Sequence, residues 1–313
     1  MVATVWLCPG QGAQKVGMAK DLAERFPAAQ EVLQAVDDAL QVSLSRLMFQ
    51  GPEDELTATQ NAQPAILAHS AAVFALVRER AGDVLAAAGH SLGEYTAYFT
   101  AGALDLRGAA KLVRRRGELM HKAGKERPGT MAAILGLATA DVEAGCKAAS
   151  RANEVVVAAN LNAPDQTVIS GDPDAVTRAG LECKQRGAKR VMALNVSGAF
   201  HSPLMRSAVN HLQLALERAE FNDPAFPVVA NATAEVVKDA ARARRLLSDQ
   251  LTAPVRWVEC MQHLARLAGA GGARYIEIGP GNVLAGLLQR IVPEANVVSL
   301  GTADEVTKFL ETA

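Results

Sequence analysis

The sequence predicts an α/β fold, in which helices cover both faces of a mostly parallel sheet and a small ferredoxin-like subdomain is inserted. Short apolar runs alternate with helical runs along most of the chain. Between about residues 127 and 197 the order becomes strand-helix-strand, twice over. The chain has 313 residues, half of them hydrophobic, which is enough for a large core. We therefore expect a discontinuous large subdomain, 1–126 and 198–313, and a small subdomain, 127–197.

Glycine and proline mark the element boundaries in the first third of the chain. Phe26-Pro27 and Gly51-Pro52 interrupt a group of helical runs, and Pro64 is placed in the first turn of a long apolar helix. The predicted elements are strands at 4–8 and 84–88 and helices at 63–80, 94–103 and 106–122.

The middle segment contains shorter, β-rich runs. Pro173 suits the first turn of a helix, and Asn160–Asp165 has the composition of a loop between two strands. The predicted elements here are strands at 130–137, 155–159, 166–170 and 190–196 and helices at 139–151 and 172–186.

The larger pattern then resumes, with strands at 228–230 and 275–278 and helices at 203–219, 240–251, 258–268 and 283–291. In a parallel sheet the functional loops lie at the carboxyl ends of the strands. We expect the loops at Gln11, Ser91, His201 and Gly279 to gather at that edge.

Composition excludes several classes of protein. Lys plus Arg (32) nearly balance Asp plus Glu (33), so no global field points to nucleic acid or a membrane as partner. The four cysteines are scattered singly, which indicates reduced thiols rather than disulfides or a metal site. The first apolar run lacks a basic segment before it, and no apolar stretch is long enough to span a bilayer. A cytoplasmic protein is expected.

Residues 89–93, Gly-His-Ser-Leu-Gly, lie between a predicted strand and a predicted helix. This is the context in which G-x-S-x-G forms a nucleophile elbow, with the serine oxygen exposed near a helix N-terminus. Ser91 is therefore the candidate nucleophile. The alternative is a turn serine that caps the helix at Glu94.

A serine nucleophile needs a base, and histidine is the usual one. Four of the six histidines fall within helical runs, where a structural role is expected; they are His69, His121, His211 and His263. His90, inside the elbow, is expected to point away from Ser91. His201 lies in a turn between a strand and a helix, and it is the candidate base.

Arg116 falls on the apolar stripe of the helix predicted over 106–122, which runs through Leu112 and Leu119. Its neighbours Arg114 and Arg115 fall off the stripe and are expected to be solvated. A buried guanidinium requires an anionic partner, either a structural carboxylate or the carboxylate of a substrate.

Six motifs occur in a fixed order along the chain. They are Gly10-Gln11-Gly12-Ala13-Gln14, Gln63-Pro64-Ala65, Gly89-His90-Ser91-Leu92-Gly93-Glu94, Arg116-Gly117, Gly198-Ala199-Phe200-His201-Ser202 and Glu277-Ile278-Gly279-Pro280-Gly281. In this ordered set the chain resembles the malonyl-CoA:acyl-carrier-protein transacylases of fatty acid synthesis and the acyltransferase domains of polyketide synthases. The resemblance covers essentially the whole chain and is far more specific than any single motif.

The resemblance implies an α/β-hydrolase-like large subdomain with a ferredoxin-like insertion. It implies that Ser91 is the nucleophile, His201 the base and Arg116 the residue that binds the substrate carboxylate. The backbone N–H groups of Gln11 and Leu92 would form the oxyanion hole.

Further roles follow from the same resemblance. Gln250 would orient the histidine through its backbone carbonyl. Gln63, Asn160, Asn162 and Phe200 would contribute to substrate binding.

Two positions depart from the usual family pattern. Ala13 stands where many members have serine, with little expected effect because that loop acts through its backbone. Phe200 before the histidine matches a malonyl-selective sequence of polyketide domains, but Gly198 and Ala199 match only part of that signature.

The implied substrate is malonyl-CoA, with no bound cofactor and no metal, and the implied partner is an acyl carrier protein. A monomer is expected. Carriers of this pathway are acidic, and basic residues near the cleft could bind them. The alternative is that these residues are only a solvated helix end. They are Lys184, Arg186, Lys189 and Arg190.

Two other classes remain open from the residues alone. A serine esterase shares the elbow and the fold, but its histidine usually lies near the C-terminus, where only His263 fits, and it leaves Arg116 unused. A non-catalytic subunit of a larger synthase is the second. An acyltransferase subunit of a polyketide or malonate-decarboxylating system would share the same chemistry.

Overall fold

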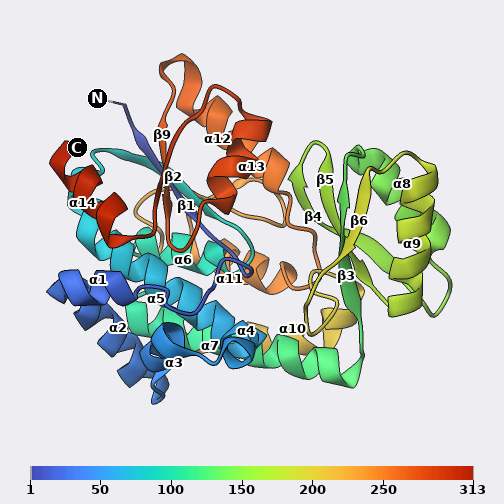
Figure 1. The fold of residues 1–313 in the computed structure, drawn as a ribbon, viewed down its shortest axis with the longest axis horizontal. Coiled ribbons are helices and arrows are strands. Elements are labelled where there is room, and N and C mark those ends of the chain that lie inside the picture. The colour runs from blue at the N-terminus through green and yellow to red at the C-terminus, as the bar shows by residue number, and fades with distance from the viewer. Residues whose placement is uncertain (1, 313) are drawn as a thin grey trace.

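A six-stranded sheet forms the centre of the large lobe in the computed structural model, which describes residues 2–312 (Figure 1). The strand order is β10-β9-β1-β2-β7-β8, and every neighbouring pair is parallel except β7 and β8. The predicted α/β class is confirmed. The strands are β1 Thr4–Cys8, β2 Val84–Gly89, β7 Val228–Val229, β8 Val236–Val237, β9 Arg274–Ile278 and β10 Asn296–Leu300.

The central strand β1 is buried on both faces, as expected of a covered parallel sheet. Trp6 and Cys8 belong to the core shared with α5 and α6, whereas Val5 and Leu7 pack in the core shared with α12 and α13. The helices of this lobe are α1 Lys20–Arg25, α2 Pro27–Leu40, α3 Leu44–Gln50, α4 Glu53–Thr57, α5 Thr59–Val77, α6 Gly93–Thr100, α7 Leu106–Glu126, α10 Arg206–Arg218, α11 Ala240–Asp249, α12 Trp257–Ala268, α13 Val283–Ile291 and α14 Ala303–Thr312, with 3-10 turns at Arg78–Arg80, Pro203–Met205 and Gly269–Gly271.

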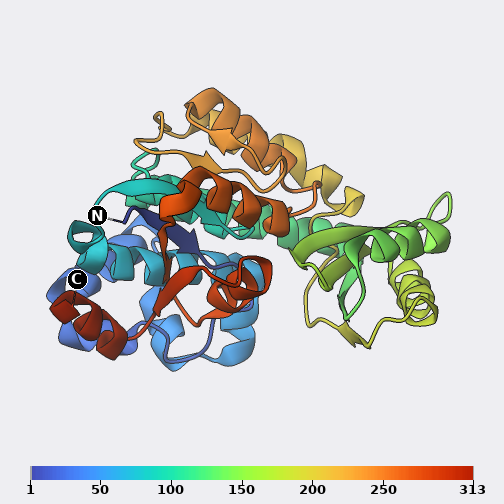
Figure 2. The same cartoon turned by 90° about the horizontal axis from the view of Figure 1, so that it is seen from above.

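A second sheet of four antiparallel strands forms the smaller lobe, which projects from one side of the molecule (Figure 2). Its order, β4-β5-β3-β6, together with two helices, is the predicted ferredoxin-like arrangement. Its elements all lie within 127–197, and the subdomain limits themselves stay a prediction. The elements of the smaller lobe are β3 Thr130–Leu135, α8 Thr139–Ala149, β4 Val156–Ala163, β5 Gln166–Gly171, α9 Pro173–Gln185 and β6 Arg190–Ala193.

Helix α5 begins four residues before the predicted start, so Pro64 lies inside it rather than in its first turn. A proline within a helix leaves the carbonyl four residues earlier without its N–H partner. Here that carbonyl, of Gln60, accepts a hydrogen bond from Arg114 Nη1 at 3.0 Å. Arg114, which was expected to be solvated, is thus partly buried and bonded to α5.

Strand β4 runs on to Ala163, so Asn160 and Asn162 lie in a strand and not in the predicted loop. The register with β5 shifts at two places in this stretch, and Asn160 also forms a bridge with Val255 of the large lobe. Such irregularities bend a strand and redirect its side chains. Strands β8 and β10 and helix α14 were not among the predicted elements.

All four cysteines are buried, at no more than 3% exposure; they are Cys8, Cys146, Cys183 and Cys260. Burial raises the pKa of each thiol above its ordinary value. Among residues 2–312 no helix has both the length and the apolar character needed to cross a membrane.

Candidate active site

Ser91 occupies a tight turn between β2 and α6, with a backbone φ of 54°. A positive φ is uncommon for a residue other than glycine and marks strain at functional turns. A Cβ at Gly89 would overlap the backbone of Gly93, and a Cβ at Gly93 would overlap the carbonyl of Cys8 on β1. The two glycines therefore allow helix, strand and turn to approach closely, as expected of a nucleophile elbow.

Asn231 and Glu94, neither of which was predicted as a site residue, hold this turn in place. Asn231 Oδ1 accepts from the Ser91 N–H at 2.7 Å, and its Nδ2 donates to the Gly89 carbonyl at 2.8 Å. Glu94 Oε2 accepts in turn from the Asn231 N–H at 3.0 Å. The only sequence signal for Asn231 is its position just after β7, at the carboxyl edge of the sheet.

His201 contacts the candidate nucleophile directly. Its Nε2 lies 2.7 Å from Ser91 Oγ, and its Nδ1 lies 2.8 Å from the carbonyl oxygen of Gln250. Because a carbonyl can only accept, Nδ1 carries the proton and Nε2 is free to accept the serine proton. Gln250 thus sets the tautomer that a general base requires. His263, the histidine that an esterase would need, lies in α12 instead.

His201 is uncharged at neutral pH. Burial, followed by the nearby positive charge of Arg116, lowers the pKa of His201 from its ordinary 6.5 to about 3. His201 Nε2 is therefore free to accept a proton over a wide pH range.

This environment predicts the pH dependence of the reaction. If Ser91 is the nucleophile and His201 its base, activity requires neutral His201, which is lost only as pH falls through its lowered pKa, about 3. The decrease in kcat/KM that an ordinary histidine causes near pH 6.5 should therefore be absent between about pH 8 and pH 5. Steady-state rates across this range test the prediction, and a fall centred near 6.5 that follows protonation of His201 in NMR would contradict it.

Arg116 is buried, at 1% exposure, and its guanidinium reaches the same serine. Nη2 donates to Ser91 Oγ at 3.0 Å and to Gln250 Oε1 at 2.8 Å, and Nη1 donates to Gln63 Oε1 at 2.7 Å. All three acceptors are neutral, and Nε has no partner among the described residues. The predicted burial is confirmed, and the cation faces the elbow without a directly bonded carboxylate.

Gln63 positions Arg116 and does not line the cavity at Ser91. Its Nε2 donates to Thr59 Oγ1 at 3.0 Å, and Thr59 Oγ1 donates to Gln11 Oε1 at 2.7 Å. A chain of hydrogen bonds therefore links the guanidinium to the loop after β1. In the part of the chain that the structure describes, no acceptor contacts the backbone N–H of Gln11 or of Leu92. Both donors remain available for an oxyanion.

Ser91 and His201 open into a cavity of about 390 Å³ between the two lobes. Phe200 lines it, as do Asn160 and Asn162 from β4. The cavity adjoins a second one of about 620 Å³; the two share Gln11, Thr57, Asn195 and Val196 as lining residues.

His90 also lines the cavity, so the expectation that it points away from the site was wrong. Its Nε2 lies 2.8 Å from Asn162 Oδ1, which joins the elbow to the small lobe. The interaction spans 72 residues of sequence, so no local pattern predicts it.

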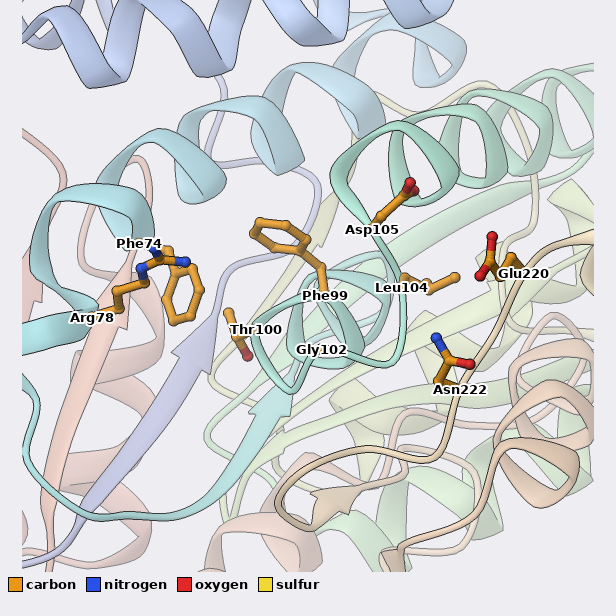
Figure 3. Close-up of a pocket in the computed structure, with 9 residues that line it drawn as sticks. All are labelled: Phe74, Arg78, Phe99, Thr100, Gly102, Leu104, Asp105, Glu220 and Asn222. Carbon is orange, nitrogen blue, oxygen red and sulfur yellow. The ribbon is translucent and has the colours of Figure 1, made fainter.

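Another cavity lacks the groups needed for acyl transfer. Its volume is about 410 Å³. Phe74, Phe99 and Leu104 form apolar walls near Asp105 and Glu220 (Figure 3). Its hydroxyl, on Thr100, donates to the Ala97 carbonyl, and none of the described lining residues is a histidine.

The loop after Gly279 lines another cavity, of about 530 Å³, beside His69. Of the four loops expected to gather, this one is therefore separate from the cavity at Ser91. Among residues 2–312 no group of three or more His, Cys, Asp or Glu is arranged to hold a metal ion.

Comparison with known proteins places these features in a family. The acyl transferase domain family matches residues 5–310. The malonyl CoA-acyl carrier protein transacylase of Bacillus subtilis is 40% identical over 100% of this chain and 98% of that protein. Its Escherichia coli K12 counterpart is 39% identical over 99% of this chain and 100% of that protein.

Solved structures show the same similarity. A malonyl-transacylase in complex with its type II PKS acyl-carrier protein (PlMCAT with AntF) has a TM-score of 0.94 and 39% identity, over 99% of this chain and 100% of that one. An acyl carrier protein S-malonyltransferase from Vibrio cholerae has a TM-score of 0.92 and 38% identity, over 97% and 99% respectively.

Proposed function

The chain belongs to the acyl transferase family, and from that membership we infer that it is a malonyl-CoA:acyl-carrier-protein transacylase. It moves malonyl from CoA to the phosphopantetheine thiol of a carrier protein and so supplies fatty acid or polyketide synthesis. One observation carries the proposal: His201 Nε2 and Arg116 Nη2 meet the same atom, Ser91 Oγ, at 2.7 and 3.0 Å. A base and a buried cation therefore both contact the oxygen of the nucleophile.

The first half-reaction forms a malonyl-serine ester. Ser91 Oγ attacks the thioester carbonyl carbon of malonyl-CoA while His201 Nε2 takes the hydroxyl proton. The N–H groups of Gln11 and Leu92 donate to the oxyanion, and each such donor typically lowers the barrier by about 3 kcal/mol. When the carbon–sulfur bond breaks, His201 returns the proton to the sulfur and CoA leaves as a thiol.

The second half-reaction runs the same chemistry in reverse with another thiol. The carrier's phosphopantetheine sulfur gives its proton to His201 Nε2 and attacks the ester carbon, and Ser91 Oγ leaves with that proton. The adjoining cavities that share Gln11 and Asn195 suit a long, thin pantetheine arm. Two thiols use one site in turn, which is a ping-pong mechanism.

Arg116 distinguishes malonyl from uncharged acyl groups. Three of its five N–H donors bond neutral protein oxygens, so its positive charge has no directly bonded anion and suits a substrate carboxylate. Phe200, Asn160 and Asn162 line the cavity that would receive the acyl group. No cofactor takes part, since malonyl-CoA is a substrate.

The carrier would dock beside the small lobe. The four exposed residues Lys184, Arg186, Lys189 and Arg190 lie at the end of α9 and the start of β6, and the chain after β6 lines the cavity from Leu194 to Val196. A basic surface there suits an acidic carrier, because opposite charges accelerate encounter. We further propose that the protein acts in the cytoplasm as a monomer.

The direct test is transfer of malonyl from CoA to a purified holo carrier protein, compared with hydrolysis of a nitrophenyl ester by the same preparation. Rapid transfer with slow hydrolysis is expected. Fast ester hydrolysis without transfer would instead indicate an esterase and remove the proposal.

Replacing Arg116 by alanine should lower kcat/KM for malonyl-CoA by about ten- to hundredfold, because a buried charge-assisted pair contributes roughly 1.5–3 kcal/mol. Transfer of acetyl, which has no carboxylate, should change much less. Arg115→Ala is the matched control, since Arg115 lies on the same helix with an exposed side chain paired to Glu118. Equal losses for malonyl and acetyl in Arg116→Ala would show that its role is structural.

A further inference from the structure

Glu94 is a fully buried carboxylate whose hydrogen bonds are incomplete. Oε2 accepts from the Asn231 N–H at 3.0 Å and from Gln250 Nε2 at 2.7 Å, whereas Oε1 has no partner among the described residues. Burying a carboxylate without full compensation is costly. Burial accordingly raises the pKa of Glu94 from 4.5 to about 7. A neutral glutamine would hold the same two donors at lower cost, so the turn alone does not explain the acid.

The side-chain amide of Gln250 connects this acid to Arg116. Its Nε2 donates to Glu94, and its Oε1 accepts from Arg116 Nη2 at 2.8 Å. The orientation of the amide is fixed, because only nitrogen can donate to the carboxylate and only oxygen can accept from the guanidinium. The amide dipole is thus aligned between an anion and a cation.

Glu94 is also the carboxylate whose charge acts on Arg116. The charge of Arg116 lowers the pKa of Glu94, and that of Glu94 raises the pKa of Arg116, against the stronger opposite effects of burial. Above about pH 7 the resting site therefore holds one positive and one negative charge. A malonyl group adds a second negative charge, whereas an acetyl group adds none.

We propose that Glu94, acting through Gln250, is the resting counter-charge of Arg116 and limits the preference of the site for malonyl over uncharged acyl groups. The inference rests on the proposed function. Substrate carboxylate and Glu94 compete for the same cation, so malonyl binds against a repulsion that acetyl does not meet. Glu94 does not contact the acyl group. It acts only through Arg116 and is therefore a positioning residue.

The test compares Glu94→Gln with the wild type at about pH 8.5, where Glu94 is charged, in transfer of malonyl and of acetyl from CoA to one carrier protein. Removing the competing charge should lower KM for malonyl-CoA and raise the malonyl-to-acetyl ratio of kcat/KM by about three- to tenfold. Any loss of kcat through altered packing should affect both substrates alike. Arg116→Ala changes the ratio in the opposite direction. A ratio that is unchanged or lower in Glu94→Gln overturns the inference.

Two further variants separate charge from structure. Glu94→Asp keeps the charge and should keep the wild-type ratio even if its kcat falls. Glu277→Gln removes another fully buried carboxylate, which binds the N–H groups of Leu284 and Ala285 instead, and should also keep the wild-type ratio. A raised ratio in either variant would contradict the inference.

If Glu94→Gln does not fold, the pH dependence of the malonyl-to-acetyl ratio of kcat/KM in the wild type tests the inference. The groups that face Glu94 are Arg116 from α7, Cys260 from α12, and Tyr95 and Tyr98 from α6. Burial raises the pKa of Cys260 and of both tyrosines, so these three stay neutral. As pH rises through about 7, Glu94 becomes charged and the ratio should fall. A constant ratio between about pH 6 and pH 8.5 overturns the inference.

The outcomes also separate this inference from the proposed function. A wild-type protein that transfers malonyl, with an unchanged ratio in Glu94→Gln, removes only the role of Glu94. A wild-type protein that transfers no malonyl removes both.

Discussion

Ser91→Ala should abolish malonyl transfer, with a loss on the order of 10⁶-fold, as when the nucleophile of a serine triad is removed. Without Oγ no ester can form, His201 Nε2 has no hydroxyl to accept from, and Arg116 Nη2 loses the oxygen to which it donates. The fold should persist, because the turn is held by the Ser91 backbone N–H and by Gly89 and Gly93.

Mass spectrometry after incubation with malonyl-CoA provides the measurement. The wild-type protein should gain one malonyl group on the peptide that contains Ser91, and the variant should gain none. Ser207→Ala, at an exposed position on α10, should be labelled like the wild type. A malonyl group found on any other residue would remove Ser91 as the nucleophile.

His201→Ala should slow acylation by about 10²- to 10⁴-fold, the usual contribution of a general base. Ser91 would keep the Arg116 contact but lose the acceptor for its proton. Rapid-quench measurement of ester formation tests this directly. His211→Ala, on the exposed side of α10, is the control and should acylate normally.

The losses of activity caused by Ser91→Ala and His201→Ala should not be additive. A protein carrying both Ser91→Ala and His201→Ala should be about as inactive as Ser91→Ala alone, because the base has no function without its nucleophile. If the losses in the two single variants multiply, the two residues do not act on the same step.

Local sequence was sufficient for the parts of the site that depend on local geometry. The elbow follows from two glycines around Ser91, and the burial of Arg116 follows from helical periodicity. The strand-helix alternation predicted both sheets, although it missed β10 and α14 at the end of the chain.

Contacts between distant segments explain what sequence could not predict. Asn231 and Glu94 hold the elbow across 137 residues of chain, so neither stands out in its own segment. Helix α5 tolerates Pro64 only because Arg114 reaches back over 54 residues to the carbonyl left free. Asn160 has a loop-like context, yet β5 and Val255 supply strand partners for it. In each case tertiary hydrogen bonds override local preference.

The burial of all four cysteines has a practical consequence for kinetics. A thiolate is the reactive form of cysteine, and these side chains are neither accessible nor ionised near neutral pH. In the absence of carrier protein, a thiol-reactive dye therefore reports only the CoA released from malonyl-CoA, with no background from the enzyme. The amplitude of the initial burst of dye reaction then counts functional active sites.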